Sequence, residues 1–472
     1  MEFMSLKISR LEQVCFCSLL VLVFWIPIPL ASNRVWSSTI FEIWSAILLF
    51  FVLFCYHQHG FNFIKRKLVP FLWLIVPISI FQLWCAVQLI SWPILWLDII
   101  SSKSAEIYRA VGVTHAPISL DPFSTELSLL RGIAFLFVII TSALLINTVK
   151  RMRLVLTTLV CSGVFQALYG AFEVLLAQKY SLVFGYEIGP AATGSFLYKN
   201  HFANYLLLCL CLGVGLIVGD LHASPSGSWV RRLLRWSEGA LSRKMFWRLA
   251  IIIMVIGLVM SHSRMGNSAF FASTVIGSLV ALACYKDKPR ALMAFIISLL
   301  LIDTVVVGSL FGLNQLQQEI VHTSFATETR DEVVEWSLPI IADFPYTGTG
   351  MGSYASVFSS YTQRAIGYYD HAHNEYIEFA VEAGVPMTLM LGGMCLWALW
   401  LCVRVMKTHN SKTLKGAALG CFMAIVGMLL HIAVDFNLQA PANAMTFILI
   451  LTLVGCFKSI QAQRRLLGSS HV

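Results

Sequence analysis

The residues best suited to chemistry form one polar stretch, 370–376, which reads Asp-His-Ala-His-Asn-Glu-Tyr. It closes a long polar segment and lies just before a hydrophobic run that restarts at Pro386. Titratable side chains beside strongly apolar sequence are costly, and function is their default explanation. An imidazole can act as a general base near neutral pH, so His373 is the first candidate catalytic residue.

The residues after His373 predict a short helix from Asn374 to Ala383, ended by Gly384. Three carboxylates at i, i+3 and i+7 fall on one face of it: Glu375, Glu378 and Glu382. His373 would lie at the helix N-terminus, where the helix dipole disfavours the imidazolium form and favours the neutral base. The alternative is a capping histidine that only satisfies groups at the helix end.

A metal site is a second alternative, because His371 and His373 form a His-x-His pair beside Asp370. Side chains two residues apart share a side only where the backbone is extended. No second acidic pair stands out to complete such a site. We therefore predict no metal ion and no cofactor.

The composition places this stretch in a membrane protein. The chain has 472 residues, of which 58% are hydrophobic and 12% charged, and its mean hydropathy is +0.77. Soluble domains carry about 25% charged residues, so a soluble enzyme is excluded. The net charge of +9 comes mostly from short loops between apolar runs, which does not point to nucleic acid. The 12 cysteines lie in or beside apolar runs and lack zinc or disulfide spacing.

Apolar runs near the ~20 residues that a bilayer requires predict an all-α, polytopic membrane protein with about twelve transmembrane helices. These runs are 12–31, 37–57, 69–92, 125–147, 152–177, 202–219, 247–262, 265–284, 291–312, 385–405, 414–433 and 442–460. The chain then forms a single membrane domain, 1–472. Its long loop 313–384 contains short helices and carries the candidate catalytic motif.

The basic residues predict the orientation of these spans. With the N-terminus inside, most of the 33 lysines and arginines fall in segments on the inside. That bias is the positive-inside pattern. Both termini are therefore expected to be cytoplasmic, with the loop 313–384 and the candidate site outside.

Other polar residues gather at the predicted outer ends of spans. Lys199, Asn200 and His201 close an outer loop, and Arg264 lies in a tight Ser-His-Ser-Arg turn. The sequence from Arg330 to Ala342 predicts a helix on the membrane surface. The glycine-rich segment 345–352 is either a tight structural turn or a phosphate contact.

Tyr354 follows that segment and is a candidate substrate contact, as are His371 and Asn374. Further on, His431 and Asp435 end the predicted eleventh span, one helical turn apart, and could pair there. We expect them to shape the site.

Together these residues resemble the O-antigen ligase / O-antigen polymerase superfamily of bacterial envelope enzymes. The resemblance covers the topology of the whole chain and is sharpest over 192–205, 261–266 and 330–387, with a tail at 431–437. The ligase signature of that family is His, then Asn, Ser or Gln, nine residues, Gly, two residues, and Gly, Thr or Tyr. Here His373, Asn374 and Gly384 match, and Met387 departs at the last position.

This resemblance implies a GT-C-like, metal-independent, inverting glycosyltransferase in the bacterial inner membrane. The donor would be a glycan on undecaprenyl diphosphate, and the acceptor a glycan, a lipid A-core or a protein. His373 would activate the acceptor hydroxyl. Arg264 and Arg330, with Lys199 as a weaker third, would stabilise the leaving diphosphate.

A transporter or flippase of lipid-linked glycans is the competing function. Such proteins usually contain two related halves and a site at the membrane midplane. No internal repeat is visible, and the polar residues gather at one face instead. The sequence does not distinguish polymerase, lipid ligase and protein glycosyltransferase from one another.

Overall fold

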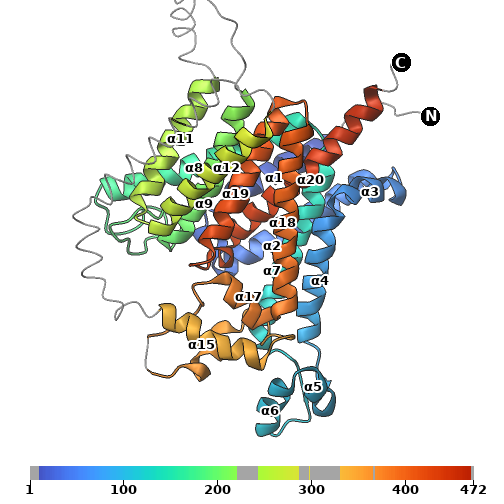
Figure 1. Cartoon of the computed structure of the whole chain (residues 1–472), viewed down its shortest axis with the longest axis vertical. Helices are drawn as coiled ribbons and strands as arrows, with labels where there is room; N and C mark the ends of the chain where they lie inside the picture. Colours follow the sequence, from blue (N-terminus) through green and yellow to red (C-terminus); the bar gives the residue numbers. More distant parts are fainter. Residues whose placement is uncertain (1–9, 221–242, 286–296, 298–329, 365–366, 469–472) are drawn as a thin grey trace, which may run out of the picture.

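The computed structural model describes residues 10–220, 243–285, 297, 330–364 and 367–468. Of residues 243, 244, 330 and 461–468 only the backbone is described. Within these ranges the protein is built almost entirely from helices, packed into one bundle with smaller elements at one end (Figure 1). The all-α fold class predicted from the sequence is confirmed.

Long apolar helices form the bundle. In chain order they are α1 (Arg10–Trp25), α2 (Val35–His57), α4 (Leu72–Gln88), α7 (Pro122–Leu145), α8 (Val149–Leu175), α9 (Lys199–Asp220), α11 (Arg243–Met260), α12 (Arg264–Cys284), α18 (Val385–Thr408), α19 (Lys412–His431) and α20 (Pro441–Gly468). Short elements join three of them: η1 (Leu30–Ser32), α3 (Phe61–Leu68) and η2 (Val69–Phe71).

Nine helical stretches within the described residues are long and apolar enough to cross a membrane, and Met245–Met260 is a shorter apolar helix. The protein is therefore an integral membrane protein. Every predicted run except 291–312 coincides with a described helix. That run lies outside the described residues apart from Ile297, so the number of twelve stays a prediction.

The centre of the bundle is α9, whose 18-residue apolar window is 100% buried. It packs closely on α19 because glycines face each other there. A Cβ on Gly215 would lie 2.6 Å from the carbonyl oxygen of Gly416. Small residues allow two membrane helices to approach in this way. The helix ends that bear Lys199 and His431 thus belong to two closely packed helices.

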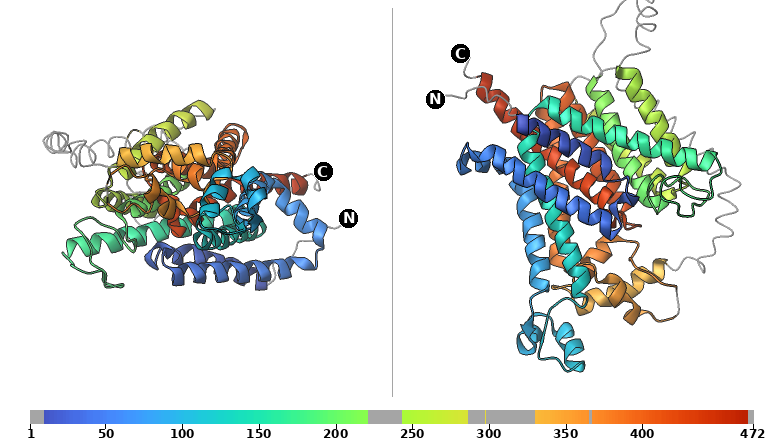
Figure 2. Two further views of the ribbon diagram at one scale, coloured as in Figure 1. Left: turned by 90° about the horizontal axis from the view of Figure 1, so that it is seen from below. Right: turned by 180° about the vertical axis from the view of Figure 1, so that it is seen from behind.

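The smaller elements gather at the end of the bundle opposite the C-terminal end of α20 (Figures 1 and 2). Between α4 and α7 lie β1 (Trp92–Pro93), α5 (Ile94–Ile100), α6 (Ser102–Ala110) and β2 (His115–Ala116), with the two strands antiparallel and Trp92 opposite Ala116. Before α18 lie α15 (Arg330–Asp343), α16 (Tyr354–Phe358), η3 (Ser359–Tyr361) and α17 (Glu375–Ala383), and η4 (Asn437–Gln439) joins α19 to α20.

An apolar cluster separate from the core of the bundle holds α15, α16 and α17 together. Its buried members are Val333, Trp336, Ile340, Phe344, Tyr354, Val357, Phe358, Ala372 and Val381. Burying apolar area of this kind stabilises by roughly 25 cal/mol per Å². The cluster fixes α17, which carries the polar motif, against α15 and α16.

Candidate functional site

The motif segment enters α17 through a side-chain cap. The Asn374 side chain accepts hydrogen bonds from the backbone N–H of Tyr376 (3.1 Å) and Ile377 (3.3 Å). A cap of this type is worth about 1 kcal/mol. The helix predicted from Asn374 is confirmed, with Asn374 as its N-cap. His373 precedes the cap with φ +51°, a left-handed conformation that non-glycine residues rarely adopt and that clusters at functional sites.

The glycine-rich segment braces the other end of α17. Backbone N–H groups of Thr349 and Gly350 donate to the carbonyl oxygens of Val381 (2.8 Å) and Glu382 (3.0 Å). Gly348 has φ +65°, and a Cβ there would lie 2.2 Å from the Glu382 carbonyl oxygen. Glycine is required because two backbones meet. Of the two interpretations left open by the sequence, these contacts are those of a structural turn.

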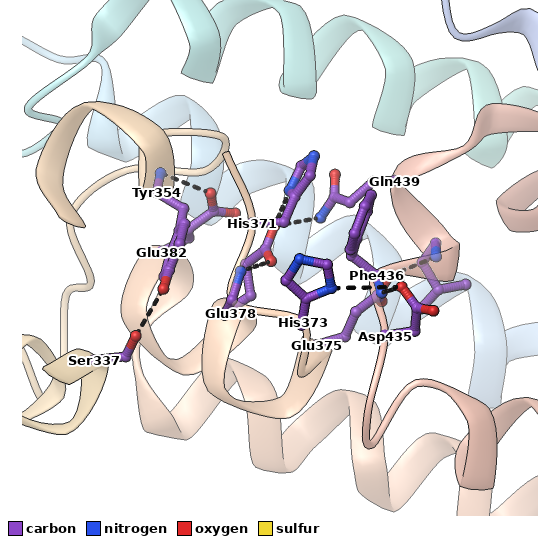
Figure 3. A network of polar contacts seen from close by, with 12 residues as sticks. Ser337, Tyr354, His371, His373, Glu375, Glu378, Glu382, Asp435, Phe436 and Gln439 are labelled. Carbon is purple, nitrogen blue, oxygen red and sulfur yellow. Dashed lines mark hydrogen bonds and ion pairs between the residues drawn. The ribbon is translucent and has the colours of Figure 1, made fainter. Parts of the chain in front are cut away.

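All three carboxylates on the predicted face of α17 are buried, with exposures of 0–1%. Glu378 accepts hydrogen bonds from three groups of two other segments: His371 Nδ1 (2.7 Å), the Ala372 backbone N–H (2.9 Å) and Gln439 Nε2 (3.0 Å) (Figure 3). Burial lowers the pKa of His371, but the Glu378 carboxylate outweighs it and leaves that pKa above its ordinary value. Glu378 thereby fixes the loop that contains both histidines.

The pKa values of the other two carboxyl groups are raised, which favours their neutral form. Burial, followed by repulsion from Glu378, raises the pKa of Glu382 to about 8, and its Oε1 accepts the Tyr354 backbone N–H at 3.0 Å. The same two causes raise the pKa of Glu375 well above its ordinary value. Glu375 accepts a hydrogen bond from the Leu438 backbone N–H. These acids therefore join α17 to α16 and to η4 without adding full charges to the interior.

The turn after α19 supplies Phe436, which contacts three histidines from two other segments. Its ring stacks on His371 (centroids 4.4 Å apart) and meets the rings of His373 and His201 edge-on, each at 4.9 Å. Its carbonyl oxygen lies 3.1 Å from His201 Nε2. We did not assign Phe436 a role from the sequence. The available signal was an aromatic residue inside a polar outer turn, between Asp435 and Asn437.

His373 faces the carboxylate of Asp435, with 3.9 Å between Nδ1 and Oδ1 (Figure 3). Both side chains are largely buried, at 15% and 1% exposure. We had predicted that Asp435 sits one helical turn from His431. That prediction is wrong, because α19 ends at His431, whose Nδ1 lies 3.2 Å from Asn204 Nδ2. The chain leaves the helix there and carries Asp435 to His373.

A cavity of about 240 Å³ opens at His371 and Phe436, the neighbours of His373 and Asp435, which do not themselves line it. Its lining comes from four separate segments: Leu30, Ala31, Asn33, Leu197, Tyr198, His201, Asp370, His371, Phe436 and Gln439. His201 lies in the wall of this cavity, and its role as a substrate contact stays a prediction. Asn200 is buried and donates to the Tyr198 hydroxyl (2.9 Å), and Lys199 is exposed at the start of α9.

The remaining predicted site residues lie at element ends. Arg264 is exposed and begins α12, in the turn that was predicted, with the preceding Ser263 as N-cap. Arg330 begins α15, and its side chain is outside the described residues. Tyr354 is buried in the cluster behind α17, and its hydroxyl lies 2.7 Å from Ser337 Oγ. Its side chain therefore supports α17 and does not line the cavity.

Among the residues that the structure describes, no group of three or more His, Cys, Asp and Glu side chains is placed to hold a metal ion. The acidic residues nearest the histidine pair are already engaged. Glu378 bonds His371, and Asp435 faces His373.

Comparison with known families gives one match. Residues 249–392 match the family model described as O-antigen ligase. The matched segment contains Arg264, Arg330 and the whole polar motif, but not His201 or Asp435. No curated protein matches the chain. The matched segment and the membrane helices support a relationship of the chain to the O-antigen ligase / O-antigen polymerase superfamily of glycan-handling membrane proteins.

Proposed function

We propose that this protein is an inverting glycosyltransferase of the bacterial inner membrane that uses undecaprenyl-diphosphate glycan as donor. The observation that carries the proposal is His373 facing Asp435 next to a polar cavity, inside the segment that matches the family. The site lies at the end of the bundle where a lipid-linked donor on the outer leaflet and an envelope acceptor meet.

His373 is the general base of the proposed reaction. A carboxylate beside Nδ1 selects the tautomer with the proton on Nδ1, so that Nε2 is the basic atom. The 3.9 Å separation is longer than a hydrogen bond, and such contacts tighten when substrate binds. Nε2 takes the proton of an acceptor hydroxyl while its oxygen attacks the anomeric carbon. The bond from that carbon to the diphosphate oxygen breaks, and the configuration inverts.

Arg264 and Arg330 stabilise the departing diphosphate in this proposal. Negative charge develops on the leaving group, and guanidinium groups bind phosphate oxygens in a bidentate manner. The exposed position of Arg264 at the start of α12 supports such a role. Lys199, exposed at the start of α9, is the weaker third cation. No metal ion takes part in the step.

The neighbouring polar residues position the base and line the cavity. His371 acts through Glu378, which it bonds at 2.7 Å, and through its stack on Phe436. His201 presents its ring to the cavity beside Asp370. Asn374 fixes the start of α17. These contacts make His371 and Asn374 positioning residues and leave the proton transfer to His373.

A transfer assay tests this proposal against transport. Purified protein in detergent micelles, with no membrane to cross, is incubated with undecaprenyl-diphosphate glycan and candidate acceptors. An enzyme releases undecaprenyl diphosphate and joins the glycan to the acceptor, with or without a strong chelator. Absence of any transfer with every acceptor class, or complete inhibition by the chelator, would contradict the proposal. Envelope analysis of a deletion strain then separates loss of chain length from loss of attachment.

A further inference from the structure

A second cavity lies against α17, within the membrane part of the bundle. It has a volume of about 200 Å³ and is enclosed by α4, α7, α17, α18, α19 and α20. Its walls are mostly apolar, with Phe81, Leu391, Phe447 and Leu451 among them. Gln439 lines this cavity and also the polar cavity beside His371. The two cavities therefore share Gln439 as a wall residue, and only the second is lined by the motif helix α17.

One cation lies in this apolar surrounding. Arg131 of α7 lines the cavity together with Glu375 and Tyr376, the first residues of α17. The Nε atom of Arg131 is buried, and the side chain as a whole is half-buried. No ion pair of Arg131 is found among the residues that the structure describes, and its Nε has no hydrogen-bond partner among them. An ionisable group at membrane depth without such a pair calls for a functional explanation.

Polar atoms around Arg131 also lack partners. Arg131 Nε, Gln82 Oε1 and Glu375 Oε2 are all buried without a hydrogen bond to any residue that the structure describes. All three residues line this one cavity. A buried polar atom left unbonded costs roughly 1–3 kcal/mol. Three of them around one space indicate a polar ligand group that binds there.

The cavity also contains unfilled space next to a glycine of α18. Gly392 lines it, and a Cβ added to Gly392 would meet no atom within 4 Å. The next residue, Gly393, has equally open surroundings but is exposed on the outside of the helix and does not line the cavity. Glycine inside a helix costs about 1 kcal/mol relative to alanine. Gly392 thus leaves space where a side chain would fill the cavity.

We propose that this cavity binds a second lipid-borne substrate, a lipid diphosphate with one hydrocarbon chain that carries the acceptor glycan. Arg131 contacts the anionic group, and the apolar walls hold a segment of the chain. The inference rests on the proposed function and names its acceptor class.

The positions of the two cations support two lipid sites. Arg264 begins α12, which packs against α9 and α19, whereas Arg131 belongs to α7, which packs against α2, α4 and α20. The views in Figures 1 and 2 place α12 and α4 on opposite sides of α18 and α19. A donor at Arg264 and an acceptor at Arg131 approach the motif helix from different sides. Two substrates of one lipid class favour chain polymerisation over attachment to a multi-chain glycolipid.

Native mass spectrometry of the purified protein tests the inference by counting bound undecaprenyl diphosphate. The wild type is expected to bind two molecules. Arg131→Gln and Gly392→Leu are expected to bind one, since each weakens the second site by about tenfold or more. Gly393→Leu is the matched control and should still bind two. Gly392→Leu removes no charge, so it keeps the test valid if Arg131→Gln does not fold.

The inference is overturned if the wild type binds only one molecule. It is also overturned if Arg131→Gln and Gly392→Leu both bind two. Equal occupancy by phosphatidylglycerol at the same concentration would also overturn it, because the cavity would then accept any anionic lipid. His373→Ala should lose transfer and still bind two molecules. Transfer by His373→Ala would therefore contradict the proposed function. An unchanged number of bound undecaprenyl diphosphate molecules in the cavity variants would contradict only the second lipid site.

Discussion

Glu382 shows how burial sets charge in this site. Burial and the neighbouring Glu378 raise its pKa to about 8, so at neutral pH the side chain is mostly protonated. The carboxyl still accepts the Tyr354 backbone N–H. A neutral acid can hold α16 and α17 together at a smaller desolvation cost than a carboxylate.

This pKa predicts a pH dependence of stability. The contribution of a group with a raised folded-state pKa is complete below its unfolded value of 4.5 and is lost as the pH rises to about 8. The apparent Tm of the wild type in detergent should therefore fall between about pH 5 and pH 8. Glu382→Gln cannot ionise and should lose less over that range. The exposed Glu126→Gln is the control, and equal slopes for wild type and Glu382→Gln would contradict the assignment.

The proposed diphosphate contact of Arg264 predicts sensitivity to a conservative change. A hydrogen bond to a charged group is worth roughly 1.5–3 kcal/mol, and an ammonium cannot form the planar fork of a guanidinium. Arg264→Lys should therefore lower the rate of transfer by about tenfold or more, as should Arg330→Ala. Arg109→Lys, at an exposed arginine paired with Asp98, is the control. Unchanged turnover in Arg264→Lys would remove that residue from the mechanism.

At the scale of elements, α17 is fixed at both ends. Asn374 caps its start, and Gly348 allows the glycine-rich turn to meet its end. The helix and its cap were predictable because asparagine before an apolar, acidic run and glycine after it are local signals. Phe436 and Asp435 were not predictable as parts of the site. They reach it only through the turn between α19 and α20, and no local pattern specifies that tertiary contact.

The Asn374 cap of α17 is expected to hold His373, the proposed base, in position. Asn374→Ala should cost about 1 kcal/mol of stability and lower transfer by about tenfold or more, because His373 is the adjacent residue and small displacements reduce catalysis. Asn374→Ser keeps a side-chain oxygen acceptor and should retain most activity. Thermal unfolding and transfer rates measured on both variants give the comparison. Equal transfer by the alanine and serine variants would show that the cap does not position the base.

At the scale of the whole molecule, hydropathy predicted the bundle well. The predicted runs and the described helices coincide because membrane spans need continuous apolar sequence. The orientation stays a prediction, since the bilayer position follows from the basic residues and not from the fold. The second cavity was invisible in the sequence. Its walls come from six helices distant in the chain, and most of the wall residues are ordinary apolar residues of such helices.

Fusion reporters test the predicted orientation. One follows Gly367, which precedes the motif, and the other follows Thr408, where α18 ends. A single membrane helix lies between these points, so the reporters should give opposite signals, with Gly367 outside and Thr408 in the cytoplasm. A fusion at the C-terminus should match Thr408. Reversed signals would place the site on the wrong side for a flipped, lipid-linked donor.

The most direct test of the central claim compares His373→Ala with His371→Ala in transfer from purified undecaprenyl-diphosphate glycan. General-base assistance contributes about 10²- to 10⁴-fold, so His373→Ala should lose transfer by that amount while the purified protein keeps the wild-type Tm within a few degrees. His371→Ala should retain a measurable fraction, because His371 acts only by ordering the loop through Glu378. Wild-type transfer by His373→Ala, or a greater loss in His371→Ala, would contradict the assignment of His373 as the base.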